Sequence, residues 1–208
     1  MAIVVIGGHS RNIGKTSVVC RLISAFPECG WTAVKITQFG HGICSANGEP
    51  CDCETAEHTI AISEEHNNAS GTDSSRYLAA GAGRSLWVRT RHGQLAEAIP
   101  RIRAEIARSE NVILESNSIL RFLKPDLYLA VLDPLVSDFK PSALRYLDRA
   151  DALLCSGEPG ANIWPGVSAA LVARIPAFRI SPPSYWSDEV ADFVRMRLSA
   201  LRQGAAVP

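Results

Sequence analysis

Residues 6–17 read Ile6-Gly7-Gly8-His9-Ser10-Arg11-Asn12-Ile13-Gly14-Lys15-Thr16-Ser17. This stretch follows a short apolar run, Ala2–Ile6, and its last residues open a helical pattern over Lys15–Ala25. Small residues in such a turn let backbone N–H groups point inward around phosphate oxygens, and the helix N-terminus adds its partial positive charge. The order of strand, glycine-rich turn, Gly-Lys-Thr and helix therefore predicts a loop that binds the phosphates of ATP or GTP.

The residues of this loop have distinct predicted roles. Lys15 is expected to reach the β- and γ-phosphates, and the Thr16 hydroxyl is expected to bind Mg²⁺. The usual spacing, G-x-x-x-x-G-K-[ST], would place its first glycine where this chain has His9. We expect Gly7 and Gly8 to supply the turn, and His9 to adopt backbone angles more natural for glycine. The predicted nucleotide-binding residues of the loop are Gly8, His9, Asn12, Ile13, Gly14, Lys15, Thr16 and Ser17.

A second motif is the apolar run Asn111-Val112-Ile113-Leu114-Glu115, which ends in a carboxylate. The pattern is typical of the strand that places an acidic side chain beside a phosphate-binding loop. Glu115 is predicted to hold Mg²⁺ through water or to orient an attacking group, and with Lys15 it forms the predicted catalytic pair. The alternative is a strand-end carboxylate that faces solvent.

Short apolar runs alternate with amphipathic stretches along the whole chain. The expected strands are Ala2–Ile6, Thr32–Ile36, Ser85–Val88, Val112–Glu115, Leu127–Leu132 and Ala152–Cys155. The expected helices are Lys15–Ala25, Ser74–Ala80, Gln94–Arg108, Ser142–Leu147, Trp164–Ala173 and Ser187–Leu201. This alternation predicts a three-layer α/β/α sandwich with a mainly parallel sheet, of P-loop NTPase type. We expect one domain over residues 1–201, with a long loop at 38–72 and a flexible tail at 202–208.

Composition argues against several classes of protein. Of the 208 residues 47% are hydrophobic, and 21 basic side chains balance 21 acidic ones. Zero net charge counts against nucleic-acid binding through a basic field. The apolar runs are too short to span a bilayer, and the N-terminus lacks the basic leader of a signal peptide. We therefore expect a soluble, cytoplasmic protein without membrane partners.

Three of the six cysteines lie in the long loop, within a segment of ten residues. Cys44, Cys51 and Cys53, with His41 and His58 nearby, form a set of soft ligands that predicts a Zn²⁺ site or an iron–sulfur cluster. The alternatives are unpaired reduced thiols or a redox pair. A metal ion here would either stabilise the structure of the loop or bind and dissociate as the nucleotide state changes.

The motifs resemble, in their order along the chain, the molybdopterin-guanine dinucleotide biosynthesis protein B (MobB) family. Besides the loop and Glu115-Ser116, the resemblance rests on Lys35-Ile36-Thr37 and on Asp73-Ser74-Ser75-Arg76, which leads to Ala80-Gly81-Ala82. It covers residues 2–120. The resemblance implies a P-loop protein that binds GTP, works as a homodimer and assists attachment of a guanosine nucleotide to molybdopterin.

By the same resemblance, Asp73 and Arg76 would lie near the nucleotide or a pterin-type ligand. Their alternative interpretation is structural, with Asp73 capping a helix and Arg76 in a solvated ion pair. An Asn-Lys-x-Asp motif that reads guanine is missing after the late strand Ala152–Cys155, so both ATP and GTP stay open.

Three functional hypotheses follow. The first is a slow, Mg²⁺-dependent NTPase of MobB type that acts in cofactor assembly. The second is a small-molecule kinase or synthetase on the same scaffold, with Glu115 as its base. The third is a nucleotide-gated metal-binding protein without useful turnover.

Overall fold

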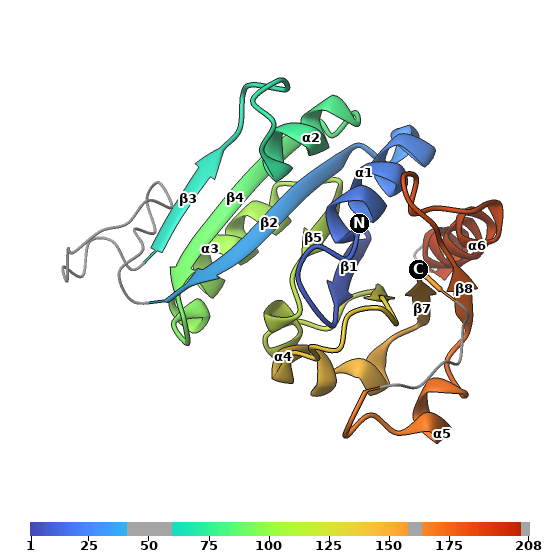
Figure 1. Ribbon diagram of the computed structural model, residues 1–208. Coiled ribbons are helices and arrows are strands. Elements are labelled where there is room, and N and C mark those ends of the chain that lie inside the picture. The colour runs from blue at the N-terminus through green and yellow to red at the C-terminus, as the bar shows by residue number, and fades with distance from the viewer. Residues whose placement is uncertain (41–59, 158–163, 205–208) are drawn as a thin grey trace.

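The computed structural model describes residues 1–40, 60–157 and 164–204 of the chain. Within these ranges eight strands form one sheet in the order β3-β4-β2-β5-β1-β6-β7-β8 (Figure 1). The strands are β1 (Ile3–Gly8), β2 (Trp31–Phe39), β3 (Ile60–Glu64), β4 (Arg84–Arg91), β5 (Asn111–Glu115), β6 (Leu127–Leu132), β7 (Ala152–Cys155) and β8 (Ala177–Arg179). All neighbouring strands are parallel except β3 and β4, which are antiparallel. The predicted α/β fold with a mainly parallel sheet is confirmed.

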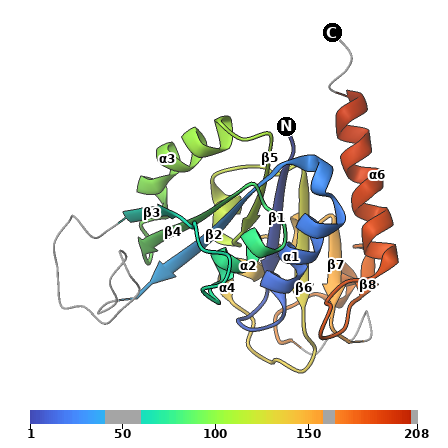
Figure 2. The same cartoon turned by 90° about the horizontal axis from the view of Figure 1, so that it is seen from above.

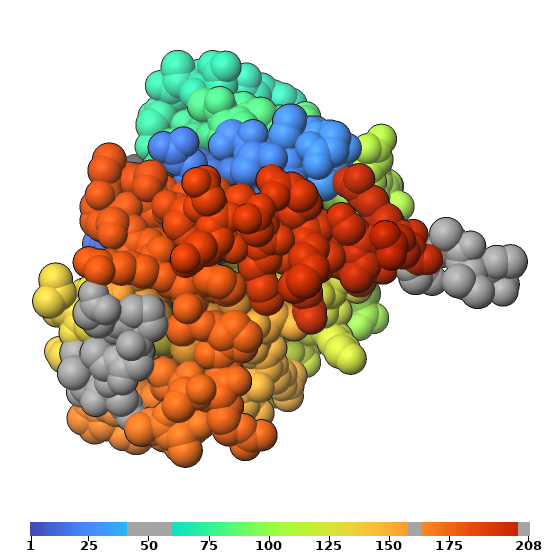
Figure 3. Space-filling model, turned by 90° about the vertical axis from the view of Figure 1, so that its right-hand side faces the viewer, coloured from blue at the N-terminus to red at the C-terminus, as the bar shows by residue number. Residues whose placement is uncertain are grey.

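Helices cover both faces of the sheet. They are α1 (Lys15–Ala25), α2 (Asp73–Ala79), α3 (Leu95–Ala107), α4 (Pro141–Leu144), α5 (Ala169–Val172) and α6 (Asp188–Gly204). The helices α1, α2 and α6 contribute to the core on one face, and α3 packs on the other (Figure 2). Figure 3 shows α6 and the segments before it, in orange and red, lying across one side of the molecule beside the blue N-terminal segments.

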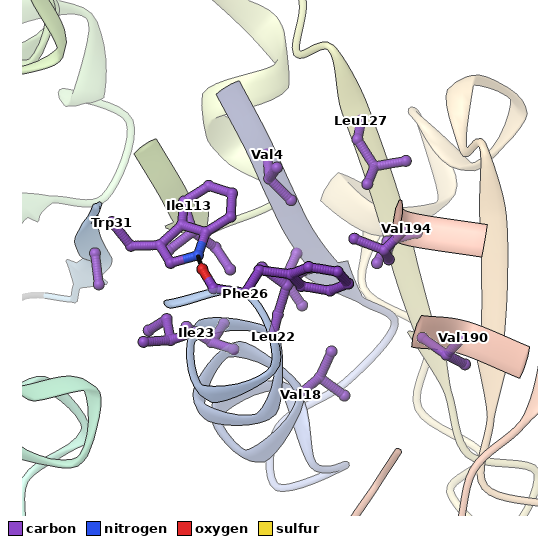
Figure 4. Close-up of a cluster of buried hydrophobic side chains, with 14 of the residues drawn as sticks. Val4, Val18, Leu22, Ile23, Phe26, Trp31, Ile113, Leu127, Val190 and Val194 are labelled. Atoms are coloured by element: carbon purple, nitrogen blue, oxygen red, sulfur yellow. Dashed lines mark hydrogen bonds between the residues drawn. The ribbon is translucent and has the colours of Figure 1, made fainter. Parts of the chain in front are cut away.

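Successive residues of β1 enter two different cores. Val4 and Ile6 belong to the cluster beneath α1 and α6, whereas Val5 belongs to the cluster beneath α3. Figure 4 shows the first cluster, to which α1 contributes Val18 and Leu22, Phe26 follows directly after α1, and α6 contributes Val190 and Val194. A strand covered on both faces is apolar at every position. Burial on both sides of the sheet thus holds the end of β1, and the loop that follows it, in a fixed place.

The boundaries of several elements differ from the prediction. The segment 38–72, expected as a loop, contains the edge strand β3, and the short strand β8 was not predicted. The expected helix Trp164–Ala173 is only the single turn α5, because Gly166 adopts a φ of 81° and follows Pro165. The helix expected over Ser142–Leu147 divides into α4 and a 3₁₀ turn, Leu147–Arg149. Helix α6 continues through Gly204, into the segment expected as a tail.

No helix in the described part of the chain is long and apolar enough to cross a bilayer.

Candidate phosphate-binding site

The loop between β1 and α1 lies at the carboxyl ends of the central strands and depends on two glycines. Gly14 precedes α1 with φ 92°, and a Cβ there would lie 2.2 Å from a ring carbon of Tyr185. At Gly7 a Cβ would lie 2.3 Å from Oδ1 of Asn117 and 2.8 Å from the Tyr128 ring. Larger residues at either position would collide with side chains that border the loop.

Asn117 holds the start of the loop from the neighbouring strand. Its Oδ1 accepts a hydrogen bond from the Gly8 N–H at 2.9 Å, and its Nδ2 donates to the Gly8 carbonyl at 2.8 Å. Asn117 directly follows β5 and Ser116, so the strand that ends in Glu115 also fixes the turn after β1. Asn12 adopts a left-handed backbone with φ 56°, a conformation that asparagine tolerates better than most residues.

His9 occupies the position of the usual first glycine, but the expectation of glycine-like backbone angles is wrong. In the described residues positive φ outside glycine occurs only at Asn12 and Tyr185. The His9 ring is fully buried, stacks on Phe139 with ring centroids 5.1 Å apart, and lies behind the loop rather than in the cavity that the loop borders. Its backbone N–H donates to Val131.

Both ring nitrogens of His9 form hydrogen bonds with the segment after β6. Nδ1 lies 2.7 Å from the Asp138 carbonyl, and Nε2 accepts from the Asp133 N–H at 3.0 Å. Burial lowers the pKa of His9. Its two partners, a carbonyl at Nδ1 and an N–H at Nε2, fit a neutral ring with its proton on Nδ1. The Lys140 N–H donates to the His9 carbonyl at 2.8 Å. His9 therefore positions the segment 133–140 beside the loop.

The substitution His9→Gly restores the usual motif, and yet we expect it to lower the free energy of unfolding by about 3 kcal/mol. The loss has two causes, a cavity beside Phe139 and the unpaired Asp133 N–H. Urea denaturation measures it, with His9→Phe retaining the ring volume and His66→Gly, at an exposed position, as the control. An unfolding free energy unchanged in His9→Gly would contradict the positioning role.

A buried carboxylate lies beneath the loop. Glu115, only 4% exposed, accepts a hydrogen bond from the Thr16 hydroxyl at 2.9 Å and one from the Tyr77 hydroxyl at 2.5 Å. The Lys35 ammonium forms a salt bridge with its other oxygen and lies 2.8 Å from Asp73. Glu115 is therefore part of a buried network, and the alternative interpretation from the sequence, a carboxylate that faces solvent, is wrong.

Strand register explains why these groups meet. Ile6 of β1 and Lys35 of β2 both pair with Glu115 of β5, so the three side chains point to the same face of the sheet, the face of α1. Helix α2 begins at Asp73, and the Thr72 hydroxyl caps it by accepting from the Ser75 N–H. Because α2 begins here, Asp73 and, one helical turn later, Tyr77 lie next to Glu115 and Lys35.

Opposite charges in the network stabilise one another. Burial would lower the pKa of Lys35, but the adjacent carboxylates Glu115 and Asp73 outweigh it and raise that pKa. Burial would raise the pKa of Asp73, yet its contacts with Lys35 lower it. Burial and then Glu115 raise the pKa of Tyr77 well above its usual value, so its hydroxyl stays a donor.

Arg76 combines features of both interpretations made from the sequence. Its guanidinium donates to the Ser17 hydroxyl at 3.1 Å and lies 3.7 Å from Asp73, with both side chains partly exposed. The solvated ion pair is therefore present, at the rim of the loop. The interpretation of Asp73 as the helix cap is wrong, because Thr72 is the cap.

The loop and the network open on a cavity of about 940 Å³. Every predicted nucleotide-binding residue except His9 lines it, as does Glu115. Seven lysine and arginine side chains border the cavity against two carboxylates, although the whole chain is neutral. The basic side chains are Arg11, Lys15, Lys35, Arg76, Arg121, Lys140 and Arg145. Such an excess of positive charge favours a polyanionic ligand.

The predicted cysteine and histidine ligands, His41, Cys44, Cys51, Cys53 and His58, lie outside the described residues. Within the ranges that the structure describes, no group of three or more His, Cys, Asp or Glu side chains could hold a metal ion. In the same ranges Cys20, Cys29 and Cys155 are free thiols. The Zn²⁺ or iron–sulfur site stays a prediction.

The topology and the loop together define a P-loop NTPase fold. The strand before the loop lies between β5 and β6 in a parallel sheet, and the acidic residue ends the adjacent strand β5. Gly-Lys-Thr begins the first helix, as the fold requires.

No protein-family model and no curated protein matches the sequence. Two solved structures resemble the chain. LpxK from Aquifex aeolicus, solved in complex with ATP, is 19% identical with a TM-score of 0.49, over 86% of this chain. This chain spans about half of LpxK, 53% of its length. HypB from Helicobacter pylori, solved with nickel, is 13% identical with a TM-score of 0.45, over 93% of this chain and 86% of HypB.

Proposed function

We propose that this protein binds the Mg²⁺ complex of a nucleoside triphosphate and hydrolyses it slowly. The supporting observation is the convergence of Lys15, Thr16 and Glu115 at the mouth of the loop, where the basic cavity begins. Lys15 would neutralise charge on the transferring phosphate, the step at which fixed cations lower the barrier most.

The oxygen donors beside the loop fit Mg²⁺. The Thr16 hydroxyl is hydrogen-bonded to Glu115 and contacts Asp73, and hydroxyl and carboxylate oxygens are the ligands that this hard cation prefers. Thr16 would bind the ion directly, with Glu115 acting through water. The bound ion would supply charge neutralisation at the phosphate oxygens.

The chain's own residues supply orientation. In this structure the Lys15 ammonium donates to the Ser10 carbonyl at 2.5 Å, across the loop. Glu115 accepts from Thr16, Tyr77 and Lys35 at once and so fixes each of their directions. We propose that Glu115 orients the attacking water through this fixed set of partners.

The more specific role that we propose is that of the MobB family, assistance in assembling a guanosine-containing molybdopterin cofactor. It is supported by the motifs on which the resemblance rests, since Lys35, Asp73 and Glu115 form one connected network beside the loop. The homodimer and the pterin-type ligand stay predictions. A kinase or synthetase is the second candidate, favoured by a cavity that extends well beyond the loop.

Calorimetric titration of the protein with ATP and with GTP, each with excess Mg²⁺ and again with EDTA, tests the proposal. We expect one site per chain for at least one nucleotide, weaker binding in EDTA, and slow release of phosphate. Absence of binding by both nucleotides at millimolar concentration would overturn it. Faster ADP or GDP formation on adding an acceptor would favour the kinase over the NTPase.

A further inference from the structure

The cavity beside the loop extends onto both faces of the sheet edge. Lys35 and Glu115 point to the α1 face, whereas Ile36, the next residue of β2, belongs to the core on the α3 face. Gln38 follows Ile36 by two residues in β2, so both side chains point to the same face of the sheet. The side chain of Gln38 accepts a hydrogen bond from the Gly93 N–H at 3.1 Å. These residues border the cavity with the first residue of α3, so the cavity has a second half opposite the loop.

Two arginines from different segments line this second half. Arg121 ends the 3₁₀ turn after β5 and lies over the ring of Phe122, 5.5 Å from its centroid. Arg145 directly follows α4, in the segment after β6, beside the buried Tyr146. Both arginines border the same cavity as the loop.

Neither guanidinium has a carboxylate partner in the described ranges. Several other arginines are ion-paired, as Arg84 is with Glu64 and Glu105, and Arg197 with Asp151. Because neither arginine is paired with a carboxylate within these ranges, the N–H donors of both planar guanidinium groups are available to a ligand in the cavity. The fork matches phosphate in a bidentate manner.

Lys140 extends the positive surface between the two halves. It is half-buried, lines the cavity, and is held in place by the backbone hydrogen bond from its N–H to His9. Its ammonium has no hydrogen-bond or ion-pair partner among the residues that the structure describes. Burial and the nearby Arg11 lower its pKa, as expected for an ammonium that faces other cations across a cavity.

We propose that Arg121, Arg145 and Lys140 form a second subsite, which binds a phosphate-bearing small molecule beside the nucleotide. The inference rests on the proposed function, because it places the nucleotide in the first half of the cavity. Aromatic and apolar side chains, Phe122, Tyr146 and Leu95, line the same cavity and would contact the organic part of that ligand.

Inorganic phosphate is the probe that tests this subsite. The loop is first saturated with a non-hydrolysable ATP or GTP analogue and Mg²⁺, and labelled phosphate is then added in equilibrium dialysis. We expect one phosphate per saturated chain, with Arg121→Ala and Arg145→Ala each weakening it about tenfold. The exposed Arg101, on α3 and outside this cavity, gives the matched control Arg101→Ala, which should bind phosphate and analogue as the parent does.

Two results would overturn the subsite, the absence of phosphate binding in saturated protein or equal binding after both arginines are replaced. Failure of the analogue to bind would instead contradict the proposed function. In that case the same dialysis on Lys15→Ala protein decides the subsite alone, since its loop lacks the main cation. Phosphate binding there that depends on Arg121 and Arg145 would support it, and any other result would overturn it.

Discussion

Lys15→Ala is expected to weaken triphosphate binding about a hundredfold. Charge-assisted hydrogen bonds to phosphate contribute about 1.5–3 kcal/mol each, and a loss of about 3 kcal/mol corresponds to a factor of about 100 in Kd. Lys15 is the one loop side chain whose ammonium lies across the turn, on the Ser10 carbonyl. Calorimetric titration compares the variant with Lys124→Ala, which removes an exposed charge outside the cavity. Parental affinity in Lys15→Ala would contradict its assigned role.

The same lysine predicts a pH dependence of binding. Burial lowers the pKa of Lys15 from 10.5 to about 8, although Glu115 opposes the shift. In the free protein the ammonium therefore loses its proton as pH rises past about 8, whereas bound phosphate stabilises the charged form. Binding then takes up a proton, and Kd should rise by up to about tenfold for each pH unit above 8.

Lys15→Arg is the matched control for this pH profile, because a guanidinium stays charged over the whole range. Its Kd should show no comparable rise between about pH 7.5 and 9.5. An identical rise in both proteins would mean that another group titrates. The comparison also separates loss of charge from loss of the folded loop.

Local patterns predicted the loop well because its sequence signature is local, although the distant residues Asn117 and Tyr185 also border and hold it. The apolar run before it, the small residues and the helix that begins at Lys15 are all consequences of short-range preferences, and the observed helix has the predicted bounds. The role of His9 could not be predicted in this way. Its ring packs on Phe139 and is hydrogen-bonded to Asp133 and Asp138, which lie more than a hundred residues away.

The missed elements are short or lie at the edges of the sheet. The strand β8 has three residues and β3 has five, and neither is fully buried, so alternation over so few positions gives little signal. Both are strands because of hydrogen bonds to an existing neighbour, β7 or β4. Such pairing is tertiary and leaves little trace in a single segment.

The candidate site was only partly visible in the sequence for a similar reason. Glu115 ends an apolar run, and Lys35 and Asp73 entered through the family resemblance. Tyr77 carried no signal beyond its place one helical turn after Asp73. Arg121 and Arg145 follow different strands, and only the parallel order of β5, β1 and β6 brings them to one cavity.

Glu115→Ala is expected to lower the free energy of unfolding by about 3 kcal/mol. It leaves the fully buried Tyr77 hydroxyl without its acceptor and removes one of the two carboxylates that neutralise Lys35. Removing one partner of a buried ion pair costs about 3–5 kcal/mol, and the remaining contact with Asp73 places this case at the lower end. Urea denaturation measures the change, with the exposed Glu97→Ala as the control.

Glu115→Gln separates stability from chemistry, because the amide retains the volume and an acceptor oxygen. Both oxygens of Glu115 accept hydrogen bonds, so the amide N–H₂ of glutamine must face one of the donors. We expect a loss of about 2 kcal/mol in the free energy of unfolding, less than for Glu115→Ala, and nucleotide hydrolysis slowed about a hundredfold because the negative charge is gone. Hydrolysis is measured as phosphate release at saturating nucleotide, beside affinity for the same nucleotide. A Glu115→Gln protein that binds and hydrolyses at the parental rate would remove Glu115 from the mechanism. A Glu115→Ala protein as stable as the parent would contradict the stabilising role of Glu115. Tyr77 and Lys35 would then be equally stable without its carboxylate.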